Sequence, residues 1–118
     1  MIKKILVVLI LNLMFFSNTN SEERNLELNK LFNQLKNNSN VSMAFEVEKK
    51  IWEIWSIHPS NNRKGYRLTE LLALGSLLIA EQELNKAYEI FSQIILADPN
   101  WPEAWNKRAT VLYLLGKY

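Results

Sequence analysis

Apolar residues recur along most of this chain every three or four positions rather than at every second one. The 118 residues include only three glycines and three prolines, so long segments run without a helix breaker. The apolar stripes are clearest in residues 28–35, 44–55, 68–80, 87–95 and 102–115. This spacing predicts an all-α protein, in which helices joined by short turns form antiparallel hairpins.

The first residues form a segment of a different kind. Lys3 and Lys4 precede an apolar run over residues 5–16, and small polar residues follow it. This order predicts a signal peptide over residues 1–21, cleaved after Thr19 or Ser21, and therefore export to the periplasm. The alternative is an uncleaved segment that anchors the protein to the inner membrane, although the run is shorter than the roughly 20 apolar residues that span a bilayer.

The charges and the missing residue types exclude several functions. The chain has 14 Lys and Arg against 12 Asp and Glu, and the two leader lysines account for the difference. A neutral mature chain lacks the sustained basic surface that nucleic-acid binding requires. There is no cysteine, and the single histidine, His58, has no second histidine to complete a metal site. We therefore predict a protein that is not an enzyme, with no catalytic residue, no metal and no cofactor.

Residues 68–99 show the pattern of a 34-residue helical repeat. The matching residues are Leu71, Leu74, Gly75, Leu78, Ala87, Phe91 and Pro99. The small residues Gly75 and Ala87 would let two helices approach closely, and the large ones would fill the space around that contact. The segment resembles a tetratricopeptide repeat, with Ile94 in place of the usual alanine.

A second repeat begins at Pro102 and stops halfway. Trp105 falls at the tryptophan position of the repeat, Ala109 stands for the glycine, and Gly116 matches the turn before the second helix. The resemblance implies a short right-handed solenoid of stacked hairpins. Its expected parts are a signal peptide (1–21), a degenerate hairpin (22–59), a linker (60–67), a repeat unit (68–101) and the first helix of an incomplete unit (102–118).

As a whole, the chain is similar to exported bacterial tetratricopeptide proteins, which implies a scaffold that binds a protein or peptide in a concave groove. The repeat register places side chains of successive first helices in this groove, and Trp101, between the units, is expected to face a partner. The candidate partner-binding residues are Thr69, Leu72, Ser76, Ala80, Trp101, Glu103, Asn106, Thr110 and Tyr113. The alternatives are a membrane-anchored envelope assembly factor and a regulatory subunit of an envelope enzyme. Membrane contact is expected only through an uncleaved leader.

The last expected helix is apolar around its circumference. Trp105, Ala109, Leu112, Tyr113, Leu114 and Leu115 are spread around the helix, whereas a terminal repeat normally turns a polar face to solvent. Two explanations follow from this pattern. The sequence is an incomplete product, or its last helix is covered by another chain, which includes self-association through this helix.

Overall fold

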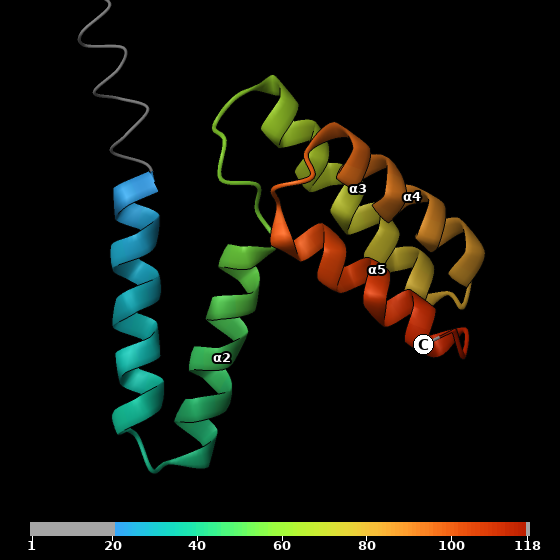
Figure 1. The fold of residues 1–118 in the computed structure, drawn as a ribbon. Helices are drawn as coiled ribbons and strands as arrows, with labels where there is room; N and C mark the ends of the chain where they lie inside the picture. Colours follow the sequence, from blue (N-terminus) through green and yellow to red (C-terminus); the bar gives the residue numbers. More distant parts are fainter. Residues whose placement is uncertain (1–20, 118) are drawn as a thin grey trace, which may run out of the picture. The chain divides into compact units, whose positions relative to one another are not determined.

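Helices make up the regular structure of residues 21–117, the part of the chain that the computed structural model describes, and no strand occurs among those residues (Figure 1). Residues 21–37 are helical, and four labelled helices follow: α2 (Val41–Trp55), α3 (Arg63–Ala80), α4 (Leu84–Ala97) and α5 (Pro102–Leu114). The prediction of an all-α fold is confirmed. The predicted signal peptide lies outside the described residues, apart from Ser21.

The chain divides into two units, Met1–Ile54 and Trp55–Tyr118. In the first unit, the helix over residues 21–37 and α2 form a hairpin joined by three residues (Figure 1). Asn40 caps α2, because its side-chain oxygen accepts hydrogen bonds from the backbone N–H groups of Ser42 and Met43. The buried apolar residues among the described part of this unit are Leu31, Val47 and Ile51.

The second unit contains α3, α4 and α5, packed one against the next. Helix α4 contacts both α3 and α5, and α3 also touches α5. Figure 1 shows the three helices side by side, an arrangement of consecutive hairpins that agrees with the solenoid-like packing predicted from the repeat. One continuous core joins them, made of Leu68, Leu72, Ala87, Phe91, Ile94, Ile95, Trp101, Ala104 and Val111.

Gly75 marks a close approach of α3 and α4. A Cβ atom placed on Gly75 would lie 2.5 Å from two ring carbons of Phe91, well inside the normal contact distance. The Phe91 side chain is fully buried, so its ring occupies the space that a side chain at position 75 would need. The predicted close crossing at Gly75 is present, with Phe91 rather than Ala87 supplying the nearest atoms.

Helix α3 begins five residues earlier than the sequence pattern predicted, so residues 63–67 of the expected linker are helical. The Asn62 side chain accepts a hydrogen bond from the Gly65 N–H at 2.8 Å and caps the helix. A Cβ atom at Gly65 would collide with the carbonyl oxygen of Ser60, so glycine permits the tight entry into the helix. Cap and glycine together turn a polar segment into a helical turn.

Candidate functional site

The α3 candidates fall into buried and exposed groups. Leu72 is 1% exposed and belongs to the core. The prediction that its side chain lines a partner-binding groove is therefore wrong. Thr69 is half-buried, and its hydroxyl accepts from the His58 N–H at 2.9 Å and donates to the Gly65 carbonyl. Ser76 is half-buried and donates to the Leu72 carbonyl, whereas Ala80 is exposed. Only the far end of α3 therefore offers candidate surface.

The α5 candidates form a clearer surface. Asn106, Thr110 and Tyr113 are all exposed, and their spacing of four and three residues places them on one face of the helix. The Thr110 hydroxyl donates to the Asn106 carbonyl at 3.0 Å. The opposite side of α5 carries Ala104 and Val111, both fully buried. This face, which we call the Asn106 face, is thus presented by a helix whose other side is fixed in the core.

The two C-terminal tryptophans differ in burial. Trp101 is 3% exposed, and its ring meets the imidazole of His58 edge-on at a centroid distance of 4.9 Å. Trp105 is 46% exposed, and its indole N–H donates to the Pro99 carbonyl at 2.9 Å. Trp101 stands immediately before α5 and packs against His58, whereas Trp105 lies within α5 and is partly exposed. The expectation that Trp101 faces a partner is therefore wrong.

His58 is the centre of a buried polar cluster. Its Nε2 atom lies 2.7 Å from a carboxylate oxygen of Asp98, and its Nδ1 atom accepts a hydrogen bond from the Ser60 N–H at 3.0 Å. Because Nδ1 is an acceptor, the ring proton is on Nε2 and is donated to Asp98. The hydrogen bond from His58 holds the pKa of the Asp98 carboxyl below its usual range. The cluster ties the segment before α3 to the end of α4.

Glu103, in the first turn of α5, is an unusual candidate. Its side chain is 6% exposed, and its Oε1 atom has no hydrogen-bond partner. Burial raises the pKa of this carboxyl, although Lys107 and Asn106 act in the opposite direction. Because it is buried, Glu103 does not belong to the Asn106 face.

Arg108 was not singled out by the repeat pattern, yet it has the most distinctive surroundings on α5. Its guanidinium carbon lies 4.8 Å from the centre of the Trp105 ring and 5.7 Å from that of the Tyr88 ring on α4. A guanidinium nitrogen also lies 3.5 Å from the Ser92 hydroxyl oxygen. Both rings can attract the cation through their negative faces. The repeat register assigns an apolar residue to position 108, so it gave no indication that a cation at this position would contact two aromatic rings.

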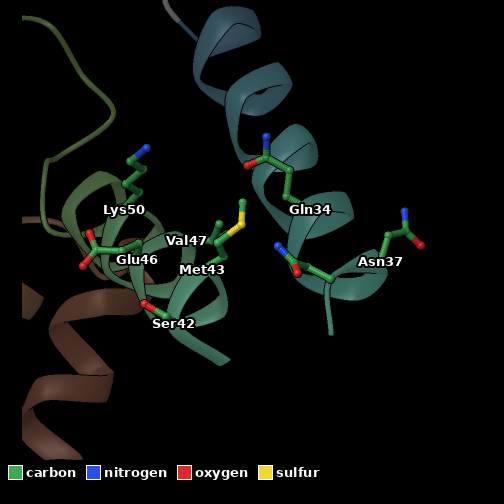
Figure 2. A pocket seen from close by; sticks show the side chains of 8 residues that line it. Gln34, Asn37, Ser42, Met43, Glu46, Val47 and Lys50 are labelled. Atoms are coloured by element: carbon green, nitrogen blue, oxygen red, sulfur yellow. The ribbon is translucent and has the colours of Figure 1, made fainter. Parts of the chain in front are cut away.

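The first unit contains an open hollow of about 490 Å³ between the helix over residues 21–37 and α2. Figure 2 shows Met43 of α2 extending toward the facing helix, and Glu46 and Lys50 of α2 also line the hollow. The remaining lining residues are Gln34, Asn37, Asn38, Ser42 and Val47. Uncharged hydrogen-bonding groups prevail, and no set of them has the composition of a metal or phosphate site.

Within residues 21–117, no helix is both long and apolar enough to cross a membrane. In the same range, no group of three or more His, Asp or Glu side chains could hold a metal ion. Comparisons of the chain with protein-family models, with curated proteins and with solved structures found no match.

Proposed function

We propose that this protein is an interaction module that binds a protein or peptide along the Asn106 face of α5. The observation that carries the proposal is the row of Asn106, Thr110 and Tyr113 on a helix whose opposite side is buried. The amide of Asn106, the hydroxyl of Thr110 and the phenol of Tyr113 can form hydrogen bonds with a polypeptide, and the Tyr113 ring adds apolar contact area. Because these side chains lie on a preformed helix, no loop has to become ordered when a partner binds, and the entropy cost of binding is lower.

The resemblance of residues 68–118 to tetratricopeptide repeats supports the same proposal. In such repeats the first helices of successive units line a shared surface. Here α3 and α5 are the first helices, and they touch each other. Ser76 and Ala80 would extend the Asn106 face onto α3, whereas the buried Leu72 would not. The uncharged face favours a neutral or apolar segment as the ligand.

The site of action is part of the proposal. The leader pattern favours export to the periplasm, and an uncleaved leader would make the protein a membrane-anchored assembly factor. Mass spectrometry of the protein recovered from the cell envelope separates these two forms, since cleavage removes about 20 residues. A role as a regulatory subunit of an envelope enzyme would require the Asn106 face to contact that enzyme.

Site-specific photo-crosslinking tests the binding surface. We expect a crosslinking amino acid at Thr110 of the full chain to capture one predominant partner in cells, and an Asn106→Ala, Tyr113→Ala double variant to lose that product. The matched control carries the crosslinker at Leu96, an exposed position of α4 outside the Asn106 face. Equal products from positions 110 and 96 would refute the proposed surface.

A further inference from the structure

One hydrogen bond holds the segment that leads into α3. Residues 56–62 connect α2 to α3, and within the described chain the Ser60 N–H is the one backbone group of residues 59–61 that forms a hydrogen bond. Its acceptor is the Nδ1 atom of His58, at 3.0 Å. The Ser60 carbonyl oxygen lies where glycine leaves room, 1.9 Å from the position that a Cβ atom of Gly65 would take. The placement of this peptide group thus depends on a side chain that can change its charge.

The imidazole of His58 is fixed on its other sides. Its side chain is 4% exposed, Nε2 lies 2.7 Å from a carboxylate oxygen of Asp98, and the ring packs edge-on against Trp101. The second carboxylate oxygen of Asp98 accepts a hydrogen bond from the Asn100 N–H at 3.0 Å, which orients the carboxylate. The ring therefore cannot turn Nδ1 away from Ser60 without giving up the contacts with Asp98 and Trp101.

The charged groups around His58 determine what a second proton does. That proton must go to Nδ1, because Nε2 already carries one, and histidine is the side chain whose charge ordinarily changes between pH 5 and 8. The charged groups recorded here are Asp98, in direct contact, and Lys64, whose charge acts on Asp98. The hydrogen bond from His58 holds the pKa of the Asp98 carboxyl below its usual range, so Asp98 is still an anion where an imidazole gains a proton. The resulting ion pair keeps the charged ring in place.

A proton on Nδ1 removes the acceptor of the Ser60 N–H. Two N–H donors then face each other at a distance that suits a hydrogen bond, with no acceptor between them. A donor that has lost its acceptor inside a protein is costly, and water can supply a new one only if the donor moves. Because Asp98 and Trp101 hold the ring, the peptide group of Ser60 is the part that has to move.

We propose that His58 is a pH-sensitive switch in the connection between the two units, in which a proton on Nδ1 releases the Ser60 N–H and loosens residues 59–61. The contact between His58 and Asp98 stays closed in both forms, so α3, α4 and α5 remain packed. The switch acts on the segment before α3 and is independent of the Asn106 face.

Solution NMR of the isotope-labelled full chain, titrated from pH 8 to pH 5, tests the switch. We expect the Ser60 amide signal to shift along the same titration curve as the His58 ring signals. Protection of the Ser60 amide from hydrogen exchange, relative to its unstructured rate, should fall about tenfold, the effect of losing one hydrogen bond. The Asn100 amide is the internal control. It donates to Asp98 on the far side of the same pair, so its protection should not change.

Two variants identify the charge that drives the change. Asp98→Asn should lower the midpoint of the Ser60 titration by about one pH unit, because a neutral amide stabilises the charged ring less than a carboxylate does. Glu81→Gln, which removes an exposed carboxylate at the other end of α3, should leave the midpoint unchanged. An equal effect of the two variants would overturn the proposal. So would a Ser60 amide that stays protected while the His58 ring titrates, a ring that does not titrate between pH 8 and pH 5, or a joint loss of protection at Ser60 and Asn100.

Discussion

The two units of this chain differ in how fully their helices cover apolar residues. In the second unit, α4 lies between α3 and α5, and Phe91, Ile94 and Val111 are all fully buried. In the first unit, α2 buries Val47 and Ile51 on one side but exposes Val41 and Phe45 on another, at 83% and 67%.

The difference shows what a well-packed helical unit requires beyond an amphipathic pattern. Both units have helices with apolar stripes, but only the second has a glycine at a helix crossing that admits a large ring. A close crossing brings many atoms into contact and excludes water from a continuous core. The first unit has no glycine among its described residues and buries fewer side chains.

Removing the central ring should have the largest effect. Phe91→Ala leaves a cavity among fully buried residues and should lower the free energy of unfolding by about 3–5 kcal/mol. Urea denaturation of the full chain, followed by circular dichroism, measures the loss. The control Phe45→Ala removes the same side chain from an exposed position of α2 and should change stability by less than about 0.5 kcal/mol. Similar losses in the two variants would mean that the units do not differ as described.

Filling the crossing should have the next largest effect. Gly75→Leu forces the Phe91 ring out of its place, so we expect a loss of about 1–3 kcal/mol in a thermal melt. Ala109→Leu changes the position 34 residues later, which is exposed, and should cost less than about 0.5 kcal/mol. A melting temperature unchanged by Gly75→Leu would show that the assigned helix crossing is incorrect.

These residues also show what the sequence alone could reveal. The apolar spacing predicted every helix in the described part, and the small residue at position 75 predicted the crossing, because both depend on local periodicity and side-chain size. The helical start at Arg63 was missed, because the polar composition of residues 60–67 predicts a loop. The Asn62 cap and the close approach of Gly65 to Ser60 make the end of this segment helical instead. Helix capping depends on a few side-chain hydrogen bonds, which hydrophobic periodicity does not record.

The site was less predictable than the fold. The repeat register singled out Asn106, Thr110 and Tyr113, which are exposed on one face of α5 because residues four and three apart share a helix face. It could not show that Trp101 packs against His58 while Trp105 stays partly exposed, since that depends on contacts between segments far apart in the sequence. The Arg108 cluster combines α4 and α5, so no single periodic segment could reveal it.

The His58–Asp98 pair should give a smaller, pH-dependent contribution. The pKa of Asp98 is lowered in the folded chain, so its stabilising effect is complete above the unfolded value near 4 and is lost as the pH falls through the lowered value. Asp98→Asn should cost about 1 kcal/mol at neutral pH, because a neutral oxygen accepts the His58 proton less strongly. Denaturation curves measured from pH 2 to 7 should converge for the two proteins at the acid end. A constant gap across that range would refute this assignment.

Glu103 should show the smallest effect, with the opposite sign. Burial raises its pKa, so the folded state is favoured while the carboxyl is protonated, and this advantage is lost as the pH rises through the raised value. Glu103→Gln removes the buried charge and should raise stability at pH 8 by about 0.5 kcal/mol. The gain should disappear near pH 4. Urea titrations at both pH values check it, and a loss of stability at pH 8 would indicate that the carboxylate has a stabilising partner.

Native-state hydrogen exchange of the full chain tests the contrast between the two units most directly, because it reports the opening free energy of each backbone amide. We predict that the amides of Leu72, Phe91 and Val111 exchange at least about 100-fold more slowly than those of Leu31, Val47 and Ile51, relative to their unstructured rates. Equal protection of the two sets would contradict the account, since it would show that the first unit is as firmly packed as the second.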